Sequence, residues 1–169
     1  MQTNLGLNKS QETFELPQAV RTFGVCRLLD EQWLEISNKG DGDVTIEVSS
    51  KTLIKSKKSL LSLNSTYFKN MLNNDFMTPE DLILRIKSWN DTVTKVFVKF
   101  LEYDVLFVPI SFEQEDWIEL TLLSKYYHVK RLTNICEYEL IYGMNPDDSL
   151  DLLKFALQNK LKSLESHCV

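Results

Sequence analysis

Cysteine and histidine are the residues of this chain best suited to metal binding or nucleophilic catalysis, and their spacing favours neither. The three cysteines are Cys26, Cys136 and Cys168, and the two histidines are His128 and His167. No CxxC pair occurs, and the one close pair joins two adjacent residues, His167 and Cys168, which rarely converge on one metal ion. We therefore expect no metal, no cofactor and no enzymatic activity, and three reduced, buried cysteines.

Glycine and lysine, which commonly hold phosphate groups, are also poorly placed for that task. None of the five glycines lies between residues 43 and 142, which excludes a P-loop and a Rossmann fingerprint. Lys55, Lys57 and Lys58 form a short basic cluster without interleaved aromatic residues. Because 19 basic and 24 acidic residues give a net charge of −5, we expect a solvated surface here and no nucleic-acid partner.

Length and composition indicate one folded domain, or one domain with an attachment. The 169 residues are 43% hydrophobic and 25% charged, which is sufficient for a buried core. The N-terminus has neither the basic nor the apolar part of a signal peptide, and no apolar run approaches the roughly 20 residues that a membrane span needs. These features predict a soluble cytoplasmic or nuclear protein without a membrane partner.

The N-terminal part divides into two segments. Residues 1–18 are polar and aperiodic, and we expect them to be mobile; residues 19–40 form an extension. Apolar residues in this extension recur at steps of three and four: Cys26, Leu29, Trp33 and Ile36, with Leu28 beside them. This spacing predicts a helix from about residue 26, which packs either on its own core or on a partner subunit.

The middle of the chain alternates between strand and helix patterns. Strands are predicted by period-two alternation or short apolar runs at residues 43–48, 51–54, 82–86 and 105–108. Helices are predicted at residues 57–72, with a break near 65–66, and from about residue 90, and Ser111 is expected to cap the following helix. Side chains expected to share the core are Leu61, Phe68, Phe97, Phe100, Leu123, Leu132 and Cys136.

The last third contains an internal repeat of 32 residues. The matched pairs are Leu120 with Leu152, Leu123 with Phe155, Ser124 with Ala156, Val129 with Leu161, Leu132 with Leu164, and Cys136 with Cys168. Each unit is predicted to be two helices joined by a short turn, with a small residue where the helices cross. Neither pair can bury its apolar face alone, so the two pairs are expected to stack.

These segments, taken in order, resemble the BTB/POZ domain followed by the start of a BACK or 3-box type helical extension. Residues 43–48, DVTIEV, are similar to the family's opening DVTLVV strand, and residues 64–72, NSTYFKNML, to its RSPYFRAMF. Residues 124–137, SKYYHVKRLTNICE, match ADKYQLERLKELCE without a gap. The resemblance implies an α+β fold, with a small three-stranded sheet capped by a helical cluster and a trailing helix pair. It places the BTB/POZ domain at 41–143 and the extension at 144–169.

The resemblance also implies a function in protein–protein association. It suggests a homodimer whose interface includes Leu28, Leu29, Trp33 and Ile36, with Asp43 and Lys58 as an acid–base pair near the dimer groove. It further suggests an adaptor that links an unknown client to a cullin-3 ubiquitin ligase. The alternative is an oligomerisation or scaffold domain for a transcriptional or signalling complex without a ubiquitin role.

The cullin-facing loop departs from the family pattern at one position. Cullin-binding members carry a hydrophobic–x–Glu motif where this chain has Phe76, Met77 and Thr78, and Glu80 lies two positions late. The resemblance therefore implies an apolar anchor without its neighbouring charge. We expect weak or absent cullin-3 binding by the unaltered chain.

Overall fold

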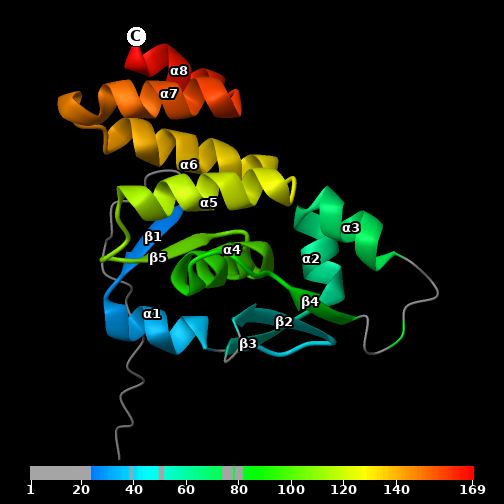
Figure 1. Ribbon diagram of the computed structural model, residues 1–169. Helices are drawn as coiled ribbons and strands as arrows, with labels where there is room; N and C mark the ends of the chain where they lie inside the picture. Colours follow the sequence, from blue (N-terminus) through cyan, green and yellow to red (C-terminus); the bar gives the residue numbers. More distant parts are fainter. Residues whose placement is uncertain (1–23, 39, 50–51, 74–77, 79–81) are drawn as a thin grey trace, which may run out of the picture.

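The computed structural model describes residues 24–38, 40–49, 52–73, 78 and 82–169 (Figure 1). The strands are β1 (Val25–Leu28), β2 (Val44–Ser49), β3 (Thr52–Ser56), β4 (Ile83–Arg85) and β5 (Leu106–Pro109). The helices are α1 (Asp30–Ser37), α2 (Lys58–Asn64), α3 (Thr66–Leu72), α4 (Asp91–Tyr103), α5 (Gln114–Tyr126), α6 (Lys130–Tyr142), α7 (Ser149–Asn159) and α8 (Lys162–Cys168). The segment 1–18, expected to be mobile, lies outside the described residues.

The predicted three-stranded sheet is present, in the order β3-β2-β4. Strand β2 pairs antiparallel with β3 and parallel with β4. Its alternation places Val44, Ile46 and Val48 in the core, while Thr45 and Glu47 are half-buried. Helix α4 packs against this sheet and α2 packs against α4, so the α+β class expected from the sequence is confirmed.

The helix predicted from residue 26 is wrong in its first turn. Residues 25–28 form β1, which pairs parallel with β5 in a second, two-stranded sheet, with Val25 opposite Leu106 and Leu28 opposite Pro109. Helix α1 begins only at Asp30. The apolar residues at steps of three and four are therefore divided between the strand β1 and the helix α1. Both elements bury one side against the same domain.

Helix boundaries in the core follow local capping groups. At the predicted break between α2 and α3, the Ser65 hydroxyl accepts the N–H of Phe68 at 3.2 Å and donates to the Tyr127 carbonyl at 2.6 Å. Asn90 caps α4 by accepting the N–H of Thr92 at 2.8 Å. Helix α5 differs from the prediction, because its N-cap is Glu113, and the Ser111 hydroxyl donates instead to Asp30.

The core lies around α4, which runs between the sheet and the layered helices α5 to α7 (Figure 1). Most of α4 is buried, including Phe97 and Phe100. All seven side chains expected to share the core are buried: Leu61, Phe68, Phe97, Phe100, Leu123, Leu132 and Cys136. The helical register predicted from the sequence is thus confirmed for these positions.

The 32-residue repeat is confirmed in backbone detail. The pair α5–α6 turns at His128 with φ 55°, and the pair α7–α8 turns at Lys160 with φ 54°. In both turns the same hydrogen bond closes the loop, from Val129 N–H to Ser124 C=O at 2.8 Å and from Leu161 N–H to Ala156 C=O at 2.9 Å. The small residues Ser124 and Ala156 are fully buried, as a close crossing requires.

Candidate interaction surfaces

The predicted dimer stripe divides between the core and the surface. Leu28 and Trp33 are each only 4% exposed, because they pack on their own domain, and Ile36 is half-buried. Leu29 is 58% exposed. An intermolecular contact by this segment must therefore use side chains on its outer side.

Two residues outside the predicted stripe extend this outer side. Leu34 is 53% exposed and lines, with Pro109, a pocket of about 230 Å³ between α1, the start of α4 and the end of β5. Ile110 is 56% exposed, and its N–H donates to the Leu28 carbonyl at 2.8 Å. We call Leu29, Leu34 and Ile110 the α1 surface. Sequence spacing missed Leu34 because it lies off the buried stripe, and missed Ile110 because it comes from a distant loop.

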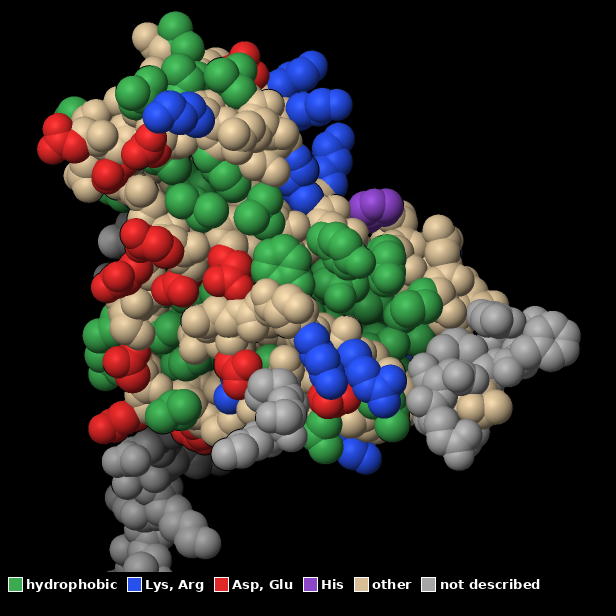
Figure 2. All heavy atoms as spheres, viewed as in Figure 1, with side chains coloured by type: hydrophobic (Ala, Val, Ile, Leu, Met, Phe, Trp, Pro, Cys, Tyr) green, Lys and Arg blue, Asp and Glu red, His purple; other side chains and the backbone are tan. Residues whose placement is uncertain are grey.

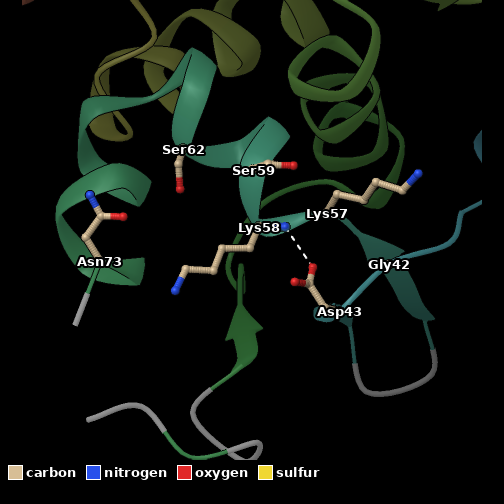
Figure 3. Close-up of a pocket in the computed structure, with 7 residues that line it drawn as sticks. All are labelled: Gly42, Asp43, Lys57, Lys58, Ser59, Ser62 and Asn73. Carbon is tan, nitrogen blue, oxygen red and sulfur yellow. Dashed lines mark hydrogen bonds between the residues drawn. The ribbon is translucent and has the colours of Figure 1, made fainter. Parts of the chain in front are cut away.

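Asp43 and Lys58 meet, but through the backbone. The Asp43 carboxylate accepts the backbone N–H of Lys58 at 2.9 Å and so fixes the first turn of α2. The Lys58 side chain extends toward Asn73, away from Asp43 (Figure 3). Gly42 permits this arrangement, because a Cβ atom there would lie 2.0 Å from the Ser56 carbonyl oxygen.

A polar pocket surrounds this pair. It has a volume of about 580 Å³ and is lined by Gly42, Asp43, Lys57, Lys58, Ser59, Ser62 and Asn73 (Figure 3). The Lys57 ammonium lies 3.6 Å from the Asp41 carboxylate, whereas, among the described residues, the Lys58 ammonium forms no ion pair with Asp43. The pocket offers cationic and hydroxyl groups to an acidic or polar partner side chain.

An aromatic ledge joins α3 to the turn between α5 and α6. The Tyr67 ring lies 5.0 Å from the Tyr127 ring and 6.1 Å from the Tyr126 ring, between centroids. Tyr127 is buried, and burial together with the neighbouring tyrosines raises its pKa to about 12. Tyr126 is 59% exposed. We call Tyr67 and Tyr126 the aromatic ledge, and Figure 2 shows hydrophobic side chains gathered in this part of the surface.

The three predicted cullin-facing residues are only partly placed by the structure. Thr78 is described and exposed, between α3 and β4. Phe76 and Met77 lie outside the described residues. The cullin-facing role of all three thus stays a prediction.

An ion pair between exposed Arg27 and buried Glu139 ties β1 to α6, which the sequence analysis did not foresee. The Arg27 guanidinium lies 3.2 Å from the Glu139 carboxylate and 5.7 Å from the Trp117 ring centre. Burial raises the pKa of the Glu139 carboxyl, and Arg27 opposes that shift. The pair lines a cavity of about 180 Å³ and is best explained as a structural link between the N-terminal strand and the helical layer.

The described residues contain no group of three or more His, Cys, Asp or Glu side chains that could hold a metal ion. Of the cysteines, only Cys136 is buried, and burial raises the pKa of its thiol, which disfavours the reactive thiolate. Cys26 and Cys168 are half-buried, which corrects the expectation that all three are buried. Within the part of the chain that the structure describes, no helix has the length and apolarity to cross a membrane.

Comparison with known proteins agrees with this architecture. A sequence model described as the BTB/POZ domain matches residues 36–144, from the end of α1 to just beyond α6. A BTB/POZ domain-containing protein of Arabidopsis thaliana is 28% identical over 109 residues, which is 64% of this chain and 43% of that protein. The match thus spans less than half of the length of this curated relative. The strand β1 and the pair α7–α8 lie outside the family match.

Proposed function

The chain belongs to the BTB/POZ domain family of protein-interaction modules, and we propose that it self-associates and links a client protein to a cullin-3 ubiquitin ligase. Self-association is assigned to the segment that contains Leu28, Leu29, Trp33 and Ile36, with Asp43 and Lys58 at the edge of the groove. Residues 76–78 are assigned to the cullin. The helices after residue 143 are proposed to begin a BACK-like extension, and the location to be cytoplasmic or nuclear.

The observation that carries self-association is the exposure of the α1 surface. Leu29, Leu34 and Ile110 are each more than half exposed and come from two segments that are hydrogen-bonded together. Apolar side chains gathered in this way are typical of protein-interaction surfaces. Leu28 and Trp33, buried beneath them, hold this surface in place.

The α1 surface predicts the effect of a double charge substitution. Leu29→Asp with Leu34→Asp should weaken dimerisation by about 2 kcal/mol or more, roughly a thirtyfold rise in the dissociation constant, because two carboxylates would enter an apolar contact. Both side chains are exposed, so the monomer should stay folded. Light scattering coupled to size-exclusion chromatography across a concentration series measures the change.

The matched control is Leu157→Asp, a similarly exposed leucine on α7. It should leave the dimer intact. The assignment would be contradicted if the unaltered chain stayed monomeric at high concentration. It would also be contradicted if the double variant dimerised as tightly as the unaltered chain.

The proposed cullin contact predicts a gain of affinity. Thr78 stands where the family motif has an acid, and it is exposed. A charge-assisted hydrogen bond adds about 1.5–3 kcal/mol, so Thr78→Glu should strengthen cullin-3 binding roughly tenfold to a hundredfold over the weak binding of the unaltered chain. Titration calorimetry with purified cullin-3 measures both affinities.

Two further variants locate this contact. Ser166→Glu adds the same charge on α8 and should leave the affinity unchanged. Phe76→Ala in the Thr78→Glu background should reverse the gain, because it removes the proposed apolar anchor. Nanomolar binding by the unaltered chain that Phe76→Ala does not affect would show that the contact lies elsewhere.

The second candidate function is an oligomerisation or scaffold domain without a ubiquitin role. Thr78 favours this alternative, because it stands where the cullin-binding motif has a charged glutamate. The polar pocket at Asp43 and Lys58 would then be the partner site. Absence of cullin-3 binding by both the unaltered chain and Thr78→Glu, with an intact dimer, would select this alternative.

A further inference from the structure

The cavity beside the Arg27–Glu139 ion pair lies where α5 begins and α6 ends, at the opposite end of these helices from their connecting turn. Its volume is about 180 Å³, and its walls come from β1, the start of α5 and the end of α6. We call it the α5–α6 cavity. Pockets that enclose whole drug-sized molecules measure roughly 300–1,000 Å³, so this cavity suits one or two side chains of a partner.

Three aromatic rings form the apolar wall of the α5–α6 cavity: Phe112, Trp117 and Tyr142. The Phe112 and Trp117 rings meet edge to face with centroids 5.0 Å apart, and both are almost fully buried, so this part of the wall is fixed. Tyr142 is 77% exposed and stacks on Tyr138, with ring centroids 6.4 Å apart. A ring this exposed adds little to the core and is available to a ligand.

Hydrogen-bond donors line the same cavity. One nitrogen of the Arg27 guanidinium lies 3.2 Å from the Glu139 carboxylate, yet the Arg27 side chain is 44% exposed. Among the described residues, the other N–H groups of Arg27, the Gln114 amide and the Tyr142 hydroxyl have no hydrogen-bond partner. Apolar rings and unsatisfied donors therefore face one small space.

Acidic side chains flank the cavity at the first turn of α5. Glu113 and Asp116 form the capping box of this helix, and Glu115 is exposed between them. In the part of the chain that the structure describes, none of the three carboxylates pairs with a lysine or arginine. Figure 2 shows Asp and Glu side chains gathered along the left edge of the view, where α5 begins in Figure 1. A ligand at this edge is favoured when it is positively charged.

We propose that the α5–α6 cavity binds a proline-rich segment of a partner protein that carries basic residues next to its prolines. Such a segment forms a polyproline II helix, whose backbone carbonyls have no partners within the helix. These carbonyls accept hydrogen bonds from Arg27, Gln114 and Tyr142, while the proline rings pack on the aromatic wall. The basic side chains face the acids of α5. Grooves lined by aromatic rings are a common means of binding such segments.

Other occupants fit the α5–α6 cavity less well. An amphipathic helix needs a long apolar groove for residues on successive turns, and this cavity is too small for that. An acidic peptide or a nucleic acid would face Glu113, Glu115 and Asp116 in a chain of net charge −5. The combination of rings, donors and acids thus selects an extended basic ligand.

Fluorescence anisotropy with a designed peptide tests this site. The ligand is a fluorescein-labelled peptide of about 12 residues, with two PxxP repeats followed by two arginines. The full chain should bind it at least tenfold more tightly than a matched peptide in which alanine replaces every proline, because the prolines preorganise the extended form. Raising the salt concentration from about 0.05 M to about 0.5 M should weaken binding severalfold.

Two exposed positions are changed in the protein. Tyr142→Ala should weaken binding at least tenfold, because it removes both a ring and a donor at the cavity. Glu115→Lys should weaken it severalfold through charge repulsion. The matched control is Tyr126→Ala, an exposed tyrosine at the other end of α5, which should bind the peptide normally. All three melting temperatures should stay close to that of the unaltered chain, since exposed side chains usually contribute under about 0.5 kcal/mol.

Nuclear magnetic resonance gives a second readout that identifies the site. The chain has three tryptophans, Trp33, Trp89 and Trp117, so its spectrum should contain three indole N–H signals. Only the Trp117 indole belongs to the α5–α6 cavity. Titration of the proline-rich peptide should shift the Trp117 signal and leave the other two unchanged.

Four results would overturn the proposal. The first is no binding of the proline-rich peptide by the folded chain at millimolar concentration. The second is equal affinity for the alanine-substituted peptide, and the third is equal affinity of Tyr142→Ala and the unaltered chain. The fourth is peptide binding that leaves the Trp117 signal unchanged. The substituted residues belong neither to the α1 surface nor to residues 76–78, so failure here is distinct from failure of the dimer or the cullin contact.

Discussion

Phe100→Ala should destabilise the domain by about 3–5 kcal/mol, a large fraction of the roughly 5–15 kcal/mol by which such domains are stable. The Phe100 side chain is 1% exposed and lies on α4, the central helix of the core. The substitution removes a ring that the surrounding elements enclose and leaves a cavity. The Arg131 guanidinium, 6.0 Å from the ring centre, loses its cation–π partner as well.

Chemical denaturation with urea measures this loss as a lower midpoint at an unchanged slope. Tyr103→Ala is the matched control, because Tyr103 is an aromatic residue on the same helix but is 53% exposed. The Tyr103→Ala substitution should lower the free energy of unfolding by no more than about 1 kcal/mol, mainly because the edge contact of Tyr103 with Phe107 is lost. Equal destabilisation by the two substitutions would show that α4 does not bury Phe100 as described.

The elements that the sequence predicts well are those whose apolar pattern is local. The alternation in β2 and the apolar face of α4 each lie within one short segment of the chain. For both elements, the predicted residue range and the predicted buried face agree with the structure. The 32-residue repeat could also be predicted from the sequence, because the small residues Ser124 and Ala156 match in the two units and both are fully buried in the structure. The positive φ at His128 and Lys160 was not, since neither residue is a glycine.

The strand β1 was missed because its partner is remote in sequence. Val25 pairs with Leu106, and the steps from Cys26 to Trp33 mimic the spacing of a helix. Short apolar runs carry no information about such pairing. A similar limit applies to Arg27 and Glu139, whose contact joins residues 112 positions apart.

The candidate surfaces were predictable in their residue types more than in their geometry. Asp43 and Lys58 do meet, but the carboxylate bonds a backbone N–H, which a side-chain pattern cannot specify. The α1 surface depends on which side of α1 the domain covers, so Leu34 and Ile110 emerged only from the fold.

A buried carboxylate, that of Glu137 in α6, helps to dock the trailing pair on the domain. Glu137 is 7% exposed, and its carboxylate accepts the N–H groups of Ser163 at 3.1 Å and Leu164 at 3.2 Å. These amides belong to the first turn of α8, where no residue of that helix caps them. The Glu137 side chain, from the pair α5–α6, thus caps the N-terminus of α8 in the pair α7–α8.

Glu137→Ala should therefore cost about 3 kcal/mol or more at α8, because two charge-assisted hydrogen bonds are lost and the buried N–H of Leu164 is left without an acceptor. Hydrogen exchange should report the change as faster exchange at residues 163–164 and along α8, with α4 protected as before.

Glu137→Gln is the matched control, since it retains an acceptor oxygen of the same reach and loses only the charge. It should give an intermediate effect. If Glu137→Ala left exchange in α8 unchanged, the pair α7–α8 would be held by its apolar contacts and by the hydrogen bond from Lys125 to the Asn159 carbonyl, with Leu164 and Ala156 as the residues to replace next. Faster exchange confined to α7 and α8 would instead show that the helices beyond the family match unfold as a separate unit, coupled to the BTB/POZ domain through the Glu137 carboxylate.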